Sequence, residues 1–155
     1  MLAQCDIRLA RPLEAPVIAL LSRDCIECGL DWSWTPGRVL RSIRDRATNV
    51  VVVRDDGGLV AFAIMRYGET QGHLDLLAVR PDRQRHGIGS AILSWLEASA
   101  RVAGLADIRL QVRATNPIAI AFYRGAGFVA NGVHRRYYQG VEDALLMTRD
   151  LIRPA

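Results

Sequence analysis

One loop of the sequence has the residue types of an anion-binding site. The segment RPDRQRHGIGSAIL, residues 80–93, sets arginines and glycines between an apolar run typical of a strand and a longer run typical of an amphipathic helix. The first N–H groups of a helix lack intrahelical partners and carry partial positive charge, so a phosphate can accept hydrogen bonds from several of them. Gly87 and Gly89 would keep side chains away from such a ligand. The loop therefore predicts a phosphate site at the start of a helix.

The glycine spacing separates this loop from dinucleotide-binding loops. A G-x-G-x-x-G fingerprint beginning at Gly87 would need a third glycine where Ile92 stands. A glycine pair before a helix is also the pattern of a plain turn, so a second segment has to decide. That segment, NPIAIAFYRGAGF at residues 116–128, has Asn116 as a predicted N-cap, Pro117 in the first turn and glycines at its end.

Together the two segments resemble the GNAT family of N-acetyltransferases. LAVRPDRQRHGIGSAIL is similar to the acetyl-CoA pyrophosphate loop of that family, whose pattern is Q/R-x-x-G-x-G/A after a strand, and NPIAIAFYRGAGF is similar to its downstream helix. The resemblance covers residues 74–128. Within the family, VRATNPIAIAFYRGAGF, HRRYY and EDALLM look most like the bacterial ribosomal-protein alanine N-acetyltransferases. Residues 1–50 carry no comparable resemblance.

The resemblance implies a fold and a cosubstrate. The implied fold is one domain over residues 1–155, of the α/β (α+β) class, with a mixed, mostly antiparallel sheet of about six or seven strands, helices on both faces, and a splay between the fourth and fifth strands. The cosubstrate is acetyl-CoA, and no metal is implied. The residues implied to bind it are Leu77, Ala78, Val79, Gln84, Arg85, His86, Gly87, Ile88, Gly89, Ser90, Asn116 and Tyr123.

The resemblance also implies a role for each group. Backbone groups of residues 77–79, where the strand bulges, would pair with the pantetheine arm and hold the acetyl oxygen, which contributes a few kcal/mol in other acyl transfers. Tyr123 would protonate the departing thiolate, because a phenol of pKa ~10 can give a proton to a thiolate whose conjugate acid has a pKa near ~8.5. Without the motif, Tyr123 would read as a core tyrosine beside Ile118 and Phe122.

A carboxylate is missing where the resembling enzymes have their general base. That base is a glutamate on the fifth strand, two residues before the arginine of VRATN, and here the position is Gln111. An amide cannot take a proton, so Gln111 could only orient a water or accept a hydrogen bond from the amine. Asp75 is the first candidate for a carboxylate that relays the proton through water, with Glu69 and Glu142 as others. A solvated strand carboxylate is the plainer reading of Asp75.

The missing base limits the choice of acceptor. At pH ~7.4 an α-amine of pKa ~7.7 to 8.0 is about 20 to 35% neutral, whereas a lysine amine is only about 0.1% neutral. The prediction is therefore a protein N-terminal α-amine or a small primary amine. Arg135, Tyr137 and Tyr138 are the predicted acceptor-binding residues, because arginine and tyrosine together make good peptide-binding walls. A plain strand with a solvated basic face, or stacking on RNA bases, are the other readings of this segment.

The remaining pattern predicts the elements that carry these residues. Alternating apolar residues predict strands over residues 5–11, 73–81, 107–114 and 142–151, and a period of three to four predicts helices over residues 13–24, 34–45, 89–104 and 117–127. Thr35 is a predicted N-cap and Gly104 a predicted helix end. Two β-rich runs over residues 49–67, with DDGG between them, predict an antiparallel hairpin.

Composition favours a small protein with an anionic ligand. The 155 residues are half hydrophobic, and 20 arginines, with no lysine, outnumber 16 acidic residues to give a net charge of +4. This modest, dispersed excess suits a small anion better than a nucleic-acid groove. No apolar run approaches the ~18 to 20 residues of a membrane span, and the first residues lack the order of a signal peptide, so we expect a cytoplasmic protein without a membrane partner.

The three cysteines predict neither a disulfide framework nor a zinc site. Cys25 and Cys28 form a C-x-x-C, but zinc would need two further ligands, and Cys5 and the histidines show no paired spacing. An odd number of cysteines without an export signal argues against a disulfide framework. We interpret the pair as incidental thiols near a helix end.

The sequence thus predicts an acetyl-CoA-dependent N-acetyltransferase and leaves alternatives open. One alternative is a CoA-binding sensor or interaction module without turnover, for which Gln111 is the sole support. Another is an RNA-directed acetyltransferase that uses the arginine-rich surface. Assembly as a homodimer is also left open.

Overall fold

The alternating apolar pattern of the chain builds one seven-stranded sheet in the order β1-β2-β3-β4-β5-β7-β6, seen in a computed structural model that describes residues 6–152. The strands are β1 (Ile7–Leu9), β2 (Thr48–Asp55), β3 (Gly58–Tyr67), β4 (Gln71–Val79), β5 (Asp107–Arg113), β6 (Val129–Tyr138) and β7 (Glu142–Asp150). Within the described residues β4 and β5 are the one parallel pair, and the other neighbours are antiparallel. The predicted mixed, mostly antiparallel sheet is confirmed.

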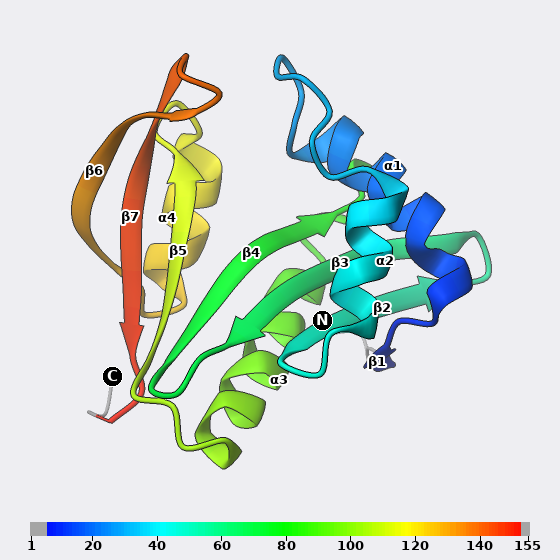
Figure 1. Cartoon of the computed structure of the whole chain (residues 1–155), viewed down its shortest axis with the longest axis horizontal. Helices are drawn as coiled ribbons and strands as arrows, with labels where there is room; N and C mark the ends of the chain where they lie inside the picture. The colour runs from blue at the N-terminus through cyan, green and yellow to red at the C-terminus, as the bar shows by residue number, and fades with distance from the viewer. Residues whose placement is uncertain (1–5, 153–155) are drawn as a thin grey trace.

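Helices cover both faces of this sheet. They are α1 (Ala15–Cys25), α2 (Pro36–Arg44), α3 (Ile88–Val102) and α4 (Pro117–Gly125), with short 3-10 turns η1 (Pro12–Glu14) and η2 (Pro81–Arg83). Figure 1 shows α1 and α2 on one side of β2 to β4, with α3 behind the sheet. Two apolar cores follow from this arrangement. One includes Ile18, Val39 and Phe62 under α1 and α2, and the other includes Ile92 and Leu96 of α3.

The helix ends follow the predicted signals. The Thr35 hydroxyl accepts a hydrogen bond from the Arg38 N–H, and the Asn116 side chain accepts one from the Ala119 N–H at 3.1 Å. Gly104 has a φ of +78°, the left-handed conformation that suits glycine after a helix. The hairpin predicted at DDGG joins β2 to β3. The first strand is confirmed over Ile7–Leu9, whereas Cys5 lies outside the described residues.

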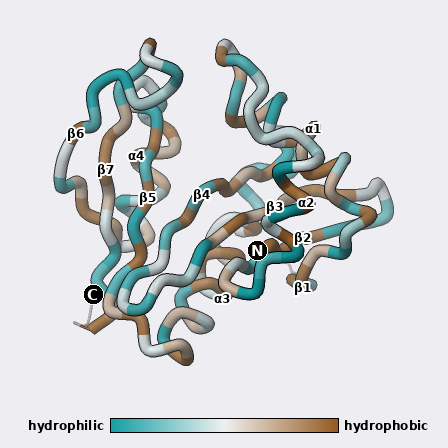
Figure 2. The backbone as a smooth tube through the Cα atoms, in the orientation of Figure 1, coloured by the Kyte–Doolittle hydropathy of each residue, from teal (hydrophilic) through white to brown (hydrophobic). Residues whose placement is uncertain are grey.

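Burial separates the middle of the sheet from its β6 edge. Residues 59–65 of β3 are all buried, because β3 has a helix layer on each side. In β6, by contrast, most residues are exposed. Figure 2 shows the hydrophilic stretch at the upper end of β6, which contains HRRYYQ. The apolar core thus lies under the helices, and the β6 edge is left for polar contacts.

Candidate active site

The sheet opens between β4 and β5. The two strands pair from Gln71 with Asp107 to Leu74 with Leu110, and β4 beyond this point pairs only with β3. A bulge marks the place, because Ile64 faces Leu76 while Met65 faces Leu74, which leaves Asp75 as the extra residue. The predicted splay between the fourth and fifth strands is confirmed.

This splay leaves a free backbone edge on β4. Leu77, Ala78 and Val79 pair with β3 on one side through Ala63, Phe62 and Ala61. Their other edge faces the opening toward β5. Backbone N–H and C=O groups along it can therefore pair with an extended ligand in the way that a further strand would.

The predicted phosphate loop lies directly after β4 and ends at α3. Gly87 is the N-cap of α3 with a φ of +80°, and Arg85 has a φ of +67°. The first backbone hydrogen bond of α3 runs from the Ala91 N–H to the Gly87 carbonyl at 3.0 Å. The N–H groups of Ile88, Gly89 and Ser90 therefore have no intrahelical partner and can donate to an anion.

The side chains of this loop divide into tied and free groups. Gln84 donates from Nε2 to the Val79 carbonyl at 3.1 Å, which fastens the loop to the end of β4. Arg83 is paired with Asp55 at 2.8 Å. Arg85 and His86 make no ion pair with any described residue and are both exposed. Arg85 is thus the loop arginine left for phosphate.

Gly89 contributes to packing besides its predicted role of leaving room for a ligand. A Cβ at this position would lie 3.0 Å from Cζ of Phe122 on α4. The absence of a side chain at Gly89 therefore lets α3 and α4 approach each other at the base of the loop. Asn116 at the start of α4 uses its Oδ1 as the cap, so its amide nitrogen can still donate to the predicted ligand.

Tyr123 of α4 lies in the apolar core of the protein. Its side chain is buried, and its ring meets Phe122 and Phe128 edge-on, with centroids 5.2 and 5.5 Å apart. Burial, together with the nearby Tyr138, raises the pKa of the Tyr123 hydroxyl above its ordinary value. The hydroxyl therefore stays protonated at neutral pH, as a proton donor requires.

The predicted polar residues of β4 and β5 come together at the vertex of the opening. Gln111 Oε1 lies 2.6 Å from His73 Nε2, and His73 Nδ1 lies 2.7 Å from Asp75 Oδ1. Arg66 of β3 donates to both oxygens of Asp75, at 2.8 and 2.9 Å. Burial alone would raise the pKa of Asp75, but hydrogen bonds from His73 and Arg66 outweigh it and lower the pKa.

His73 and Arg66 are residues that sequence reasoning missed. The signal for His73 was its spacing of two from Asp75, which places both side chains on one face of a strand. Its contact with Gln111 depends on the parallel register of β4 and β5, which no local pattern shows. Of the other candidate carboxylates, Glu69 is exposed in the β3–β4 turn and Glu142 forms an ion pair with Arg113.

Two segments that are far apart in the sequence meet near the end of the opening. The loop between α1 and α2, residues 26–35, meets the turn between β6 and β7 through Gln139. Gln139 Nε2 donates to the Asp31 carbonyl at 2.7 Å, and the Asp31 N–H donates to Gln139 Oε1 at 2.8 Å. Arg113 at the end of β5 donates to the Cys28 carbonyl at 2.7 Å and the Ile26 carbonyl at 3.2 Å. The loop is therefore fastened to both β5 and the turn.

A buried carboxylate shapes this loop. Glu27 is 5% exposed, and its Oε1 accepts hydrogen bonds from the Ser33 N–H at 2.7 Å, the Ser33 hydroxyl at 2.8 Å and the Trp34 N–H at 3.1 Å. Its Oε2 accepts from the Ser22 hydroxyl of α1 at 2.9 Å. One side chain thus fixes both ends of the loop. Cys25 is the last residue of α1 and Cys28 lies in the loop, and neither forms a disulfide with a described residue.

The predicted acceptor residues lie where β6 becomes irregular. Pairing with β7 passes from His134 opposite Ala144 to Tyr138 opposite Glu142, so Arg135 and Tyr137 lie in a bulge. The Tyr137 and Tyr138 rings meet edge-on with centroids 5.0 Å apart. Tyr138 is half-buried and close enough to Tyr123 to influence its pKa. The end of β6 therefore reaches the predicted proton donor.

The described residues contain neither a cluster suited to a metal ion nor a membrane-spanning helix. Within residues 6–152 no group of three or more His, Cys, Asp or Glu side chains could hold a metal ion. No helix in that same range is long and apolar enough to cross a membrane.

Comparison with known sequences points to one family. The profile of the acetyltransferase (GNAT) family matches residues 17–128. The chain is 40% identical over 95 residues to the ribosomal protein bS18-alanine N-acetyltransferase of Escherichia coli strain K12, a match that covers 59% of this chain and 64% of that enzyme. It is 36% identical over 125 residues to the N-alpha-acetyltransferase RimI of Mycobacterium tuberculosis, with 77% of each chain covered.

Comparison of structures gives the same picture. The crystal structure of the ribosomal-protein-S18-alanine N-acetyltransferase of Escherichia coli matches with a TM-score of 0.83 and 26% identity, over 98% of this chain and 97% of that chain. The PaiA N-acetyltransferase of Thermoplasma acidophilum in complex with coenzyme A shares the fold, with a TM-score of 0.81 and 17% identity over 96% of this chain and 99% of that chain. These relatives give no support to a protein without turnover.

Proposed function

The chain belongs to the acetyltransferase (GNAT) family, and we propose that it transfers the acetyl group of acetyl-CoA to the α-amine of a protein N-terminus. The observation that carries this proposal is the meeting of two features at one edge of the sheet. The free backbone edge of β4 ends at Val79, and the unpartnered N–H groups of α3 begin at Ile88. A long ligand with an extended arm and a pyrophosphate fits this order.

Each part of the cosubstrate has a complementary group on this chain. Residues 77–79 would pair with the pantetheine arm, and an N–H of this edge would stabilise negative charge on the acetyl oxygen. Arg85, with the N–H groups of residues 86–90, would hold the pyrophosphate. Tyr123, whose hydroxyl is protonated at neutral pH, would give its proton to the departing thiolate. Direct attack by the amine requires no metal and no covalent enzyme intermediate.

Three observations support an α-amine as the acceptor. Gln111 cannot act as a base, and an α-amine needs the least help to lose its proton. The loop over residues 26–35 and the β6–β7 turn border the opening from both sides, with Arg135, Tyr137 and Tyr138 beside it, which suits a chain end rather than an internal segment. The relatives from Escherichia coli and Mycobacterium tuberculosis carry names that specify alanine and α-amine acetylation.

A panel of amines tests this proposal directly. Acetyl-CoA would be incubated with peptides that have free N-termini, with the same peptides blocked at the N-terminus but containing lysine, and with small polyamines, and thiol release would be followed. We expect turnover with free N-termini and little with the other amines. Faster turnover of polyamines would make the acceptor a small molecule, and tight acetyl-CoA binding without thiol release would favour the sensor alternative.

A further inference from the structure

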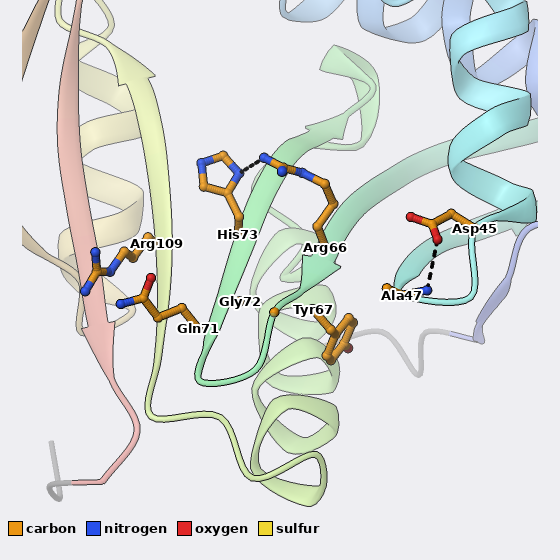
Figure 3. Close-up of a pocket in the computed structure, with 9 residues that line it drawn as sticks. Asp45, Ala47, Arg66, Tyr67, Gln71, Gly72, His73 and Arg109 are labelled. Carbon is orange, nitrogen blue, oxygen red and sulfur yellow. Dashed lines mark hydrogen bonds between the residues drawn. The ribbon is translucent and has the colours of Figure 1, made fainter.

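Four side chains from three strands form one hydrogen-bonded chain at the vertex of the opening. Arg66 of β3 holds Asp75 through both oxygens, Asp75 holds His73 Nδ1, and His73 Nε2 meets Gln111. Figure 3 shows Arg66 and His73 pointing toward each other, with the His73 ring projecting from β4 toward β5. This series of hydrogen bonds ends at Gln111, the position where the resembling enzymes would have a carboxylate.

Both ring nitrogens of His73 face an oxygen that can accept a hydrogen bond. Nδ1 lies 2.7 Å from Asp75 Oδ1, and Nε2 lies 2.6 Å from the Gln111 carbonyl oxygen. Arg66 Nη2 lies 3.0 Å from the same Nδ1, and it also donates to Asp75 Oδ1 at 2.9 Å. A neutral imidazole has one N–H and can donate to only one of the two oxygens, whereas an imidazolium donates to both. The Asp75 carboxylate therefore has two tasks beside the ring, because it offsets the charge of Arg66 and accepts the N–H of Nδ1. When the ring is neutral, the Gln111 amide can turn and donate its own N–H to Nε2, which a glutamate could not do.

Asp75, the carboxylate that contacts His73, is held in one protonation state by its surroundings. The Asp75 side chain is only 10% exposed, and its contacts with Arg66 and His73 keep it ionised. A carboxylate held in this way is a weak base but a firm partner for an imidazole N–H. The other charged and titratable groups nearby are Arg109, opposite His73 on β5, Asp45 at the end of α2, and Tyr137 of β6, which lies close enough to Arg66 to affect it.

The ring also has an outlet to water. His73 is 26% exposed and lines an open pocket of about 300 Å³ between the β3–β4 hairpin, the end of α2 and β5. Arg66, Tyr67, Gln71 and Arg109 line the same pocket (Figure 3). A proton received on the active-site side of the ring can therefore leave to solvent from the pocket.

We propose that His73 is the proton acceptor of the transfer reaction, in place of the carboxylate that Gln111 has replaced. This inference rests on the proposed function. An N–H bond of the acceptor ammonium breaks and its electron pair stays on nitrogen. The Gln111 amide turns away from the ring, and the proton passes through a water to Nε2 of His73. The amide then turns back, so that its carbonyl oxygen accepts the new N–H, and Asp75 remains a carboxylate. The neutral amine then attacks, and the imidazolium returns its proton to solvent.

The rate of acetylation against pH tests this role in His73→Gln. With a peptide acceptor, we expect His73→Gln to lower kcat/KM at least about tenfold near pH 7, because the amine must then lose its proton unaided. The loss should shrink toward wild type above about pH 9, where an α-amine is already neutral. Asp56→Asn, a carboxylate-to-carboxamide exchange at an exposed residue of the β2–β3 turn, is the control and should follow wild type at every pH.

Other outcomes separate this role from a structural one. An equal loss at every pH, or a profile identical to wild type, would overturn the proposal. If His73→Gln does not fold, Asp75→Asn can be used in its place, because it keeps the histidine and removes the negative charge beside Nδ1. The same loss of kcat/KM near pH 7, shrinking above about pH 9, is expected from it. The double variant His73→Gln with Gln111→Glu should recover the activity near pH 7. Wild-type protein that turns over no amine at all would overturn the proposed function, and this inference with it.

Discussion

The two sides of the opening between β4 and β5 are built from different kinds of group. On the proposed cofactor side, the groups open to a ligand are mainly backbone N–H and C=O groups of one continuous segment, residues 76–90. On the proposed acceptor side, side chains of β5 and of the β6–β7 turn reach backbone groups of the loop over residues 26–35. The two partners in the Asp31–Gln139 contact are 108 residues apart in the sequence.

The two sides of the opening should respond differently to substitutions. A backbone site depends on φ and ψ, so most side-chain changes leave it intact and a single disallowed conformation destroys it. A side-chain site loses affinity in steps, one contact at a time. Substitutions on the cofactor side should therefore give few but large effects, and those on the acceptor side should give graded ones.

The largest effect is expected from Gly87→Glu. A side chain at a φ of +80° is strained, and a carboxylate there repels the pyrophosphate, so the Kd for acetyl-CoA should rise on the order of 100-fold in calorimetry. Gly104→Glu is the matched control, because Gly104 has a φ of +78° at the other end of α3 with no atom near its Cβ position. If the two variants bind acetyl-CoA equally well, the phosphate site is not at the start of α3.

Tyr123→Phe should affect the chemical step alone. The ring would keep its contacts with Phe122 and Phe128, but the hydroxyl proposed to protonate the thiolate would be gone, so kcat should fall on the order of 100-fold. The Kd for acetyl-CoA is measured on the same sample and should stay within a factor of about two. An unchanged kcat with a good acceptor would remove Tyr123 from the mechanism.

Arg113→Gln tests the wider fastening of the acceptor side. Loss of the hydrogen bonds to the Cys28 and Ile26 carbonyls frees the loop, and Glu142 loses its ion-pair partner, so the KM for a peptide should rise about tenfold. The Kd for acetyl-CoA should change little. Arg41→Gln, an exchange on the exposed face of α2, is the control and should leave both constants unchanged.

Gln139→Ala should give the smallest effect. It removes two exposed hydrogen bonds that order the loop, and only part of their free energy should reach acceptor binding, so the KM for a peptide should rise about threefold while kcat stays the same. Steady-state kinetics with the best peptide measure both constants. A KM equal to that of wild type would mean that the junction of the turn and the loop does not influence acceptor binding.

The same contrast explains what the sequence could predict. The loop that leads into α3, the caps at Thr35 and Asn116 and the DDGG hairpin all depend on neighbours within a few residues, and all lie where the pattern predicted them. The splay of the sheet came from the family resemblance, and the structure confirms it. The roles assigned to individual residues at the opening stay predictions.

The contacts that sequence reasoning missed are those set by register. His73 reaches Gln111 only because β4 and β5 are parallel and aligned at Leu74 with Leu110. The resemblance implied a bulge at residues 77–79, whereas the bulge lies at Asp75 and residues 77–79 pair regularly with β3. The irregular stretch of β6, where Arg136 has a φ of +52°, has no glycine that would have indicated it. A run such as HRRYY looks like a plain strand until its partner strand is known.

The buried carboxylate of Glu27 has a thermodynamic consequence for acceptor binding. Its four hydrogen bonds order the loop over residues 26–35 during folding, before any acceptor arrives. An incoming chain end therefore meets a loop whose conformational entropy is already lost, and ordering it takes nothing from the binding free energy. Affinity for the acceptor then depends on the contacts made, and a weakly bound N-terminus can be released quickly after transfer without the loop having to unfold.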